Sequence, residues 1–379
     1  MKNNITTFSK HSMKYILLVF SICITALPLK SQSVSISVVD GYSNFGENDY
    51  PIKDGKITLN RDQIQIADHQ FTNPVGWSIS PMGYKTSFLE NRGVLILHTI
   101  NYDGQEMRDE ELDFFDPSDE TIQLYQFDDG RTILRDNVAN FTFLDPMGNT
   151  VFSESNSSQS QDGERESQLA ADVNGNTIVL YNPVIRYGDQ TGSRANLVYG
   201  DQDSEIFFRD DEREIKQVKV SENGSFITIL TQNGSGSRVL IFDRFGNDLN
   251  SMDFDEELEG VALDSTGEFL TVFTSGRVQV YNQIDGERLG SASSRASVIH
   301  AEFQPQDDTV IIFGGSVSER QITNPSLTAV HLTHRQIARE DVGFTVSSLS
   351  VDDIRISRTG NNRYRIDGLN QPLQVQANW

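Results

Sequence analysis

Histidines are the first side chains of this chain whose type and placement could do chemistry. His300 directly precedes the strand-like segment "AEF", where a lone imidazole could be a general base or only a polar lining group. His331 and His334 form an H-x-x-H pair. Residues three apart on a β-strand point to opposite faces, so we expect no shared metal ion there. The string "GGSVS" at Gly314–Ser318 lacks the final glycine of a nucleophile elbow.

Carboxylates gather in four runs, which are Asp109–Glu120, Asp162–Glu166, Asp210–Glu214 and Asp253–Glu259. Such runs could attract a basic protein surface or Ca²⁺, although most charge runs only solvate a surface. None has the spacing of an EF-hand loop, so we expect no dedicated calcium site and no cofactor. Trp77 offers a ring that could stack on a sugar, with core packing as the alternative. The candidate binding residues are Trp77, Asp210, Asp211, Glu212, Asp255, Glu256, Glu257 and His300.

The net charge limits the partners. The chain carries −23, and residues 1–33 contain four Lys and no acidic residue, which leaves −27 for the remainder. This charge repels phosphate backbones and anionic headgroups, so nucleic acid and membrane surfaces are poor partners. It favours solubility and partners with a cationic surface. We expect a monomer.

The elements that must position these residues recur along the chain. "VKVSENGSFITIL" (Val218–Leu230) matches "VALDSTGEFLTVF" (Val261–Phe273): each has a strand, a polar turn ending in glycine, and a second strand. The turns follow one another at intervals of 47, 45, 49, 43, 41 and 52 residues. They are centred on Gly83, Gly130, Gly175, Gly224, Gly267, Asp308 and Gly360. This period predicts an all-β, seven-bladed β-propeller of four-stranded antiparallel blades, with six or eight blades as alternatives.

The seventh repeat contains only three predicted strands, and its outer strand must come from elsewhere. The N-terminal segments Ser33–Val39 and Lys56–Ile66 are strand-like and precede the first repeat. We expect either of these N-terminal strands, within residues 34–66, to complete the last blade and close the ring, which removes a free sheet edge. In this topology every connection between successive blades lies at the same end of the disc, so the acidic runs should share one rim.

The turn sequences "SENGSF", "DSTGEF" and "SPMGYK" resemble the Ser-Pro-Asp-Gly-Lys-type turn of bacterial WD40-like and lactonase-like β-propellers. The resemblance extends over residues 74–366. It implies the propeller fold and carries no specific activity, because propellers host both binding proteins and enzymes.

The first 33 residues predict a secretory signal peptide. Met13-Lys14 is followed by the apolar run Tyr15–Leu29 and by small residues at Ser31 and Ser33. The alternative is an uncleaved N-terminal anchor, but the run is shorter than a transmembrane helix requires. We therefore expect cleavage, and no membrane span in the mature chain. Cys23, the chain's one cysteine, lies in this segment. A mature chain without cysteine suits a bacterial periplasmic or secreted protein, with residues 34–379 as a single propeller domain.

Two functions remain open from the sequence. The first is an exported, non-catalytic propeller that binds a protein or small ligand through its acidic face. The alternative is a propeller hydrolase of carbohydrate or lactone type, with its site at the central channel. A buried His–carboxylate or carboxylate pair in that channel would favour the hydrolase.

Overall fold

The computed structural model describes residues 31–113, 115–157, 166–200, 203–234 and 236–379. These residues form strands, turns and two single-turn 3₁₀ helices, η1 (Pro305–Asp307) and η2 (Val351–Asp353). Within these ranges no helix has the length and apolar character needed to cross a bilayer.

The strands form eight antiparallel sheets, most of them made of four consecutive strands. The first sheet is β2 (Asp49–Ile52), β3 (Gly55–Asn60), β4 (Gln63–Ile66) and β5 (His69–Thr72). The second is β6 (Pro74–Ile79), β7 (Lys85–Asn91), β8 (Leu95–Asn101) and β9 (Glu106–Leu112). The third is β10 (Gln123–Gln126), β11 (Thr132–Asp136), β12 (Asn140–Leu144) and β13 (Thr150–Ser155). The fourth and fifth are β14 (Gln168–Ala171), β15 (Ile178–Tyr187), β16 (Gln190–Tyr199), β17 (Asp203–Asp210); and β18 (Glu214–Val220), β19 (Phe226–Gln232), β20 (Ser237–Asp243), β21 (Asp248–Phe254). The sixth is β22 (Gly260–Leu263), β23 (Phe269–Phe273), β24 (Arg277–Asn282), β25 (Arg288–Ser293). The seventh is β26 (Val298–Gln304), β27 (Thr309–Ser318), β28 (Gln321–His331), β29 (Gln336–Asp341), with β30 (Val346–Ser347) beside β28. The eighth is β31 (Arg355–Gly360), β32 (Arg363–Asp367), β33 (Leu373–Asn378) and β1 (Ser33–Val38).

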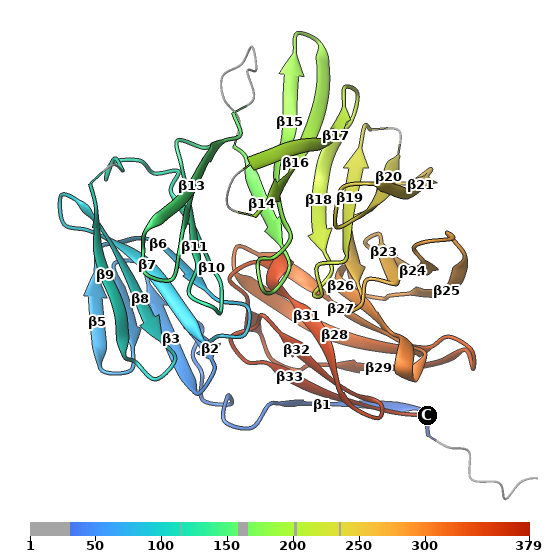
Figure 1. Ribbon diagram of the computed structural model, residues 1–379. Helices are drawn as coiled ribbons and strands as arrows, with labels where there is room; N and C mark the ends of the chain where they lie inside the picture. The colour runs from blue at the N-terminus through green and yellow to red at the C-terminus, as the bar shows by residue number, and fades with distance from the viewer. Residues whose placement is uncertain (1–30, 114, 158–165, 201–202, 235) are drawn as a thin grey trace, which may run out of the picture.

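The sheets succeed one another in chain order around a common centre, which makes the chain a β-propeller (Figure 1). The first strands of several successive sheets contact one another, β14 with β18, β18 with β22, β22 with β26 and β26 with β31. These first strands therefore line the centre. The predicted count of seven blades is not confirmed, because the described residues form eight sheets, one of the alternatives left open by the repeat.

The last sheet is completed by the N-terminal strand, as the sequence predicts for Ser33–Val39. β1 pairs antiparallel with β33, from Ser33 opposite Asn378 to Val38 opposite Leu373. The alternative closing segment, Lys56–Ile66, does not pair there, since β3 and β4 belong to a separate first sheet. That sheet escaped the repeat because its outer strand, β5, is polar and largely exposed, and its last turn uses Ala67 at φ 49° instead of glycine.

The closure yields a first testable expectation. Val34 on β1 is 4% exposed and packs in a core cluster shared by the last two sheets. Replacing it with aspartate buries a carboxylate without a partner and should lower the free energy of unfolding by about 3 kcal/mol or more. The neighbouring Ser35 is exposed on the other face of β1, so Ser35→Asp is the matched control. Urea unfolding of both variants checks this, and equal midpoints would contradict the closure.

Packing between sheets follows the radial arrangement. Seven apolar clusters each join one pair of neighbouring sheets, from the first and second to the seventh and eighth. Central strands such as β8 are therefore buried along almost their whole length, as their unbroken apolar runs predict. The first and eighth sheets meet differently: Asn370 Nδ2 donates to Gly46 O at 3.1 Å, and Gln371 Nε2 donates to Phe45 O at 2.8 Å.

The recurrent turn has a local physical cause. Gly224 and Gly267 have φ of 68° and 78°, where glycine is favoured. Three residues earlier, a Ser or Asp side chain accepts backbone N–H groups of the turn: Ser221 Oγ accepts from Phe226 N at 3.0 Å, and Asp264 Oδ1 from Phe269 N at 2.8 Å. The sixth turn uses Asp308 at φ 47°. In the seventh, Asn362 at φ 52° takes the left-handed conformation expected at Gly360.

This topology gives the propeller two ends. We call the end with the links between sheets the connection face; it includes residues 211–213, 255–259, 294–297 and 342–354. The other end, with the turns around Gly83, Gly130, Gly175, Gly224 and Gly267, is the turn face. Each first strand runs from the connection face toward the turn face, so its opening residues lie at the mouth of the centre.

Candidate functional site

The predicted acidic residues lie in two adjacent connections, which we call the acidic rim. Asp210 ends β17, and Asp211 and Glu212 follow it; Asp255, Glu256 and Glu257 link β21 to β22. Asp211, Glu212, Asp255 and Glu257 are exposed, and the other two are half-buried. Of the other runs, Asp109–Leu112 belongs to β9 instead of a connection, and 162–165 lies outside the described residues.

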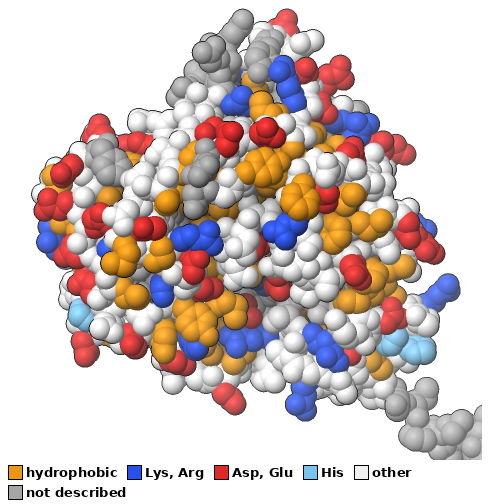
Figure 2. Space-filling view, in the orientation of Figure 1, with side chains coloured by type: hydrophobic (Ala, Val, Ile, Leu, Met, Phe, Trp, Pro, Cys, Tyr) orange, Lys and Arg blue, Asp and Glu red, His pale blue; other side chains and the backbone are white. Residues whose placement is uncertain are grey.

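Basic side chains accompany the acidic rim. Arg209 Nε lies 2.8 Å from Asp211 Oδ1, Arg277 pairs with Glu256, and Lys216 Nζ lies 3.9 Å from Glu257 Oε1. In Figure 2 acidic side chains are likewise interspersed with Lys and Arg on the face shown. The acidic rim is therefore an excess of carboxylates among cations and not a continuous negative surface.

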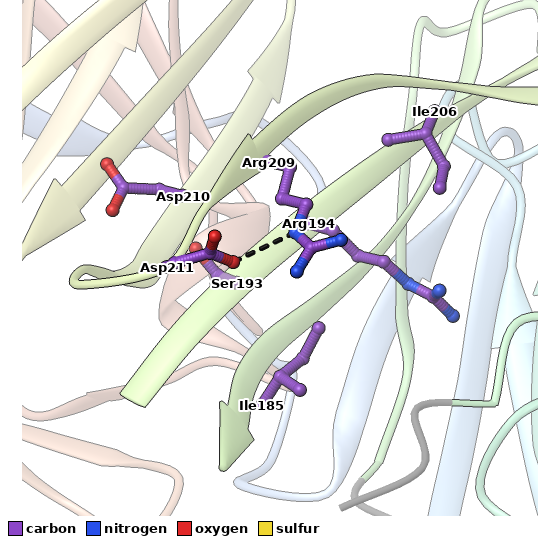
Figure 3. A pocket seen from close by; sticks show the side chains of 7 residues that line it. All are labelled: Ile185, Ser193, Arg194, Ile206, Arg209, Asp210 and Asp211. Atoms are coloured by element: carbon purple, nitrogen blue, oxygen red, sulfur yellow. Dashed lines mark hydrogen bonds and ion pairs between the residues drawn. The ribbon is translucent and has the colours of Figure 1, made fainter. Parts of the chain in front are cut away.

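Asp210 and Asp211 also line a small cavity with Ile185, Arg194 and Ile206, beside the strands β15, β16 and β17 (Figure 3). Its volume is about 30 Å³, so it has space for little more than a water molecule. A larger groove of about 520 Å³ lies on the turn face, between the first and second sheets, and includes Lys56 and Tyr102. None of the predicted site residues lines that groove.

Trp77 lies on the inner strand β6, opposite Phe88 of β7. It is half-buried and packs against the apolar cluster of the first two sheets. The guanidinium of Arg320 lies 5.4 Å from the ring centroid. This placement gives Trp77 a packing role, with one cation–π contact at its free side.

His300 lies on the inner strand β26, near the connection face. The pairing of β26 with β27 shifts between Val298 and His300, and β18 has the same irregularity between Ile215 and Gln217. Bulges re-aim the side chains that follow them. His300 is 8% exposed, and its Nε2 has no hydrogen-bond partner among the described residues. The nearest carboxylate is Glu302, whose Oε2 lies 3.6 Å from that nitrogen.

Glu302 is held by neutral donors. Its Oε1 accepts from Gln304 Nε2 at 3.1 Å, and its Oε2 accepts from Ile356 N at 3.2 Å. Gln304 Nε2 also donates to Ile356 O at 2.8 Å, so this network connects the seventh sheet to the eighth.

A third group of side chains reaches this point from η2. Gln217 Nε2 donates to Asp352 Oδ1 at 2.8 Å, and Lys219 Nζ donates to Asp352 O at 3.2 Å. These contacts connect the fifth sheet to the link before the eighth, and the red coil of η2 lies near the centre of Figure 1. We call Lys219, His300, Glu302, Asp352, Asp353 and Arg355 the channel cluster.

The protonation of the channel cluster is strongly perturbed. Burial, together with the positive charges of Lys219 and Arg355, lowers the pKa of His300 to about 3. Burial raises the pKa of Glu302 to about 8, with the charges of Glu222 and Asp264 adding to it. Burial also lowers the pKa of Lys219, although the negative charges of Asp352 and Asp353 act in the opposite direction. At neutral pH His300 is thus an uncharged imidazole beside a largely protonated carboxyl group.

Two histidine arrangements differ from the sequence analysis. The expectation that His331 and His334 lie apart is wrong: their ring centroids are 4.4 Å apart, because β28 ends at His331 and the turn folds His334 back. His98, which the sequence analysis missed, lies between two carboxylates, with Nδ1 2.7 Å from Glu106 and Nε2 3.2 Å from Glu90. Its cluster with Glu106 and Asp109 is the metal-type grouping found among the described residues. The pairing of β8 with β9 places these three side chains close together. Their spacing in the sequence is not a recognised metal-binding pattern.

Comparisons with known proteins give only distant structural similarity. Neither a protein-family model nor a curated protein matches the chain. It is similar to a solved chain of a mitotic checkpoint complex, with TM-score 0.45, 10% identity, and coverage of 80% of this chain and 89% of that one. A eukaryotic initiation factor is similar with TM-score 0.47 and 10% identity, over 84% of this chain and 90% of that one. The β-propeller domain of Myceliophteria thermophila Cps50 (Swd1) is similar with TM-score 0.43 and 10% identity, over 80% of this chain and 95% of that one. The strand order remains the basis for calling the chain a propeller.

Proposed function

We propose that this protein is an exported, non-catalytic propeller that binds a protein partner with a cationic surface at its connection face. The observation that carries this proposal is the pair of adjacent acidic connections, Asp210–Glu212 and Asp255–Glu257, presented side by side on one end of a rigid ring. Exposed carboxylates of this kind steer basic partners and set the orientation of docking.

The experiment compares two variants of equal net charge. In the rim variant Asp210, Asp211 and Asp255 become Asn, and Glu256 and Glu257 become Gln. The control variant neutralises five exposed carboxylates on the turn face, Glu222, Asp248, Glu268, Asp285 and Glu287. The probe is a fluorescent decalysine peptide, followed by anisotropy at low and at physiological salt.

We expect the rim variant to bind the peptide about tenfold more weakly, because local charges dominate once salt screens distant ones. The control variant should bind like the wild type at physiological salt. Equal weakening of both variants would reduce the acidic rim to part of a general negative charge. Loss of calcium-dependent melting in the rim variant alone would instead indicate a cation site.

One observation favours the alternative function, a hydrolase of carbohydrate or lactone type. His300 and Glu302 form the buried His–carboxylate pair that the sequence analysis named as its mark, 3.6 Å apart at the centre of the ring. A neutral imidazole and a protonated carboxyl group are suited to general base and general acid roles. Turnover of a lactone or glycoside panel that disappears in His300→Ala would replace the binding proposal with this one.

A further inference from the structure

The channel cluster contains hydrogen-bond donors that no protein group uses. Arg355 begins the inner strand β31 and is half-buried; it interacts electrostatically with Asp353 but makes no hydrogen bond or ion pair with another described residue. His300 Nε2 is likewise without a partner, although the residue is more than nine-tenths buried. Lys219 Nζ donates to the carbonyl oxygen of Asp352 at 3.2 Å and lies 3.8 Å from the Oδ1 atom of the same residue, so its charge is partly paired. A buried polar atom left without a partner usually marks the place of a ligand or water.

The charges that face this point come from four elements. Lys219 on β18 and Arg355 on β31 are cations, and both add to burial, the larger cause, in lowering the pKa of His300. Glu302 on β26 accepts two neutral hydrogen bonds, and its raised pKa of about 8 leaves it largely uncharged at neutral pH. Asp352 on η2 is exposed and accepts from Gln217. Asp353, also on η2, has its pKa raised by burial.

The charges that act on His300 itself are the cations Lys219 and Arg355, and the carboxylates Asp352 and Asp353 interact with these cations from η2. A cation placed beside His300 would be repelled by Lys219 and Arg355. An anion would pair with both, and it would accept hydrogen bonds from His300 Nε2 and from the guanidinium fork of Arg355, which suits planar or tetrahedral oxyanions.

We propose that the channel cluster is a binding site for a small oxyanion, a carboxylate or a phosphate, held by Arg355, Lys219 and His300 and entered from the connection face. This site is separate from the acidic rim and does not depend on a protein partner. The exposed η2 residues Val351 and Asp352 border its entrance.

The test is a titration of the full-length protein with two probes, sodium acetate and inorganic phosphate, in a low-chloride buffer at pH 7. The readouts are the imidazole NMR signals of His300, assigned with His300→Asn, and the melting temperature. Arg355→Gln is the test variant. Arg244→Gln is the matched control, because Arg244 is exposed on the turn face and loses the same charge.

We expect saturable binding in the wild type, a His300 pKa that rises by one unit or more in the bound state, and a higher melting temperature. Arg355→Gln should bind at least tenfold more weakly, and Arg244→Gln should bind like the wild type. Tighter binding of acetate would assign the site to organic acids, and tighter binding of phosphate would assign it to phosphorylated ligands. Absence of saturation in the wild type, or equal binding in all variants, would overturn the proposal.

Discussion

Replacing Arg135 with methionine is expected to lower the free energy of unfolding by about 3 kcal/mol, one of the two largest effects we expect. Arg135 is 1% exposed. Its Nη1 donates to Ser167 O at 2.7 Å and its Nη2 donates to Thr121 O at 3.0 Å, so one side chain joins the links before β10 and β14. Methionine fills a similar length of space and leaves both carbonyl oxygens without their donor. Urea unfolding at pH 7 measures the difference.

The control separates the hydrogen bonds from the ion pair. Arg135 Nη2 also lies 2.6 Å from Glu166 Oε1, but this carboxylate is about half exposed. Glu166→Gln removes the ion pair and keeps both carbonyl contacts, so it should cost less than about 1 kcal/mol. If the two variants are equally destabilised, the carbonyl contacts of Arg135 are not what stabilises the junction of the third and fourth sheets.

Glu302→Gln is expected to remove a large part of the pH dependence of stability between pH 5 and pH 9. The pKa of Glu302 rises from an ordinary 4.5 to about 8 in the folded protein. The protonated form of Glu302 therefore stabilises the folded state. Its contribution to the free energy of unfolding is fully present below pH 4.5 and is lost as the pH rises to about 8. At 1.36 kcal/mol per pKa unit, the wild type should lose on the order of 4 to 5 kcal/mol more than the variant over this range.

The measurement is the difference in unfolding free energy between wild type and variant at several pH values, which cancels the titration of the other groups. Glu222→Gln serves as the control, because Glu222 is an exposed turn-face residue whose charge contributes to the shift at Glu302. It should change the slope only slightly. A parallel pH profile for wild type and Glu302→Gln would show that the carboxyl group is already ionised at neutral pH in the folded ring.

The two tests concern different levels of the structure. The Arg135 variant measures how much the contacts between the third and fourth sheets contribute to the free energy of unfolding. The same contacts position links that belong to the connection face. Glu302 measures the environment at the centre, on which both the hydrolase alternative and the oxyanion site depend. If Glu302 titrates with an ordinary pKa, the hydrolase alternative and the oxyanion site both lose support. The binding proposal for the acidic rim does not depend on this result.

The sequence by itself determined the repeating unit of this protein. A Ser or Asp side chain three residues before a glycine closes the turn by local hydrogen bonds, as at Ser221 and Asp264, so the turn is visible wherever its residues occur. Unbroken apolar runs such as β8 then show that sheets stack on both sides. The closing strand β1 followed from counting strands in the last repeat.

Only the tertiary structure decided the number of sheets and the chemistry of the centre. The first sheet has a polar edge and a left-handed alanine in its last turn, so its Asp54-Gly55 turn is the one local signal that resembles the repeat. Lys219, His300 and Arg355 are far apart in the chain and meet because three inner strands converge. Their protonation depends on burial and on each other's charges, and these are long-range quantities that a single stretch of sequence does not contain.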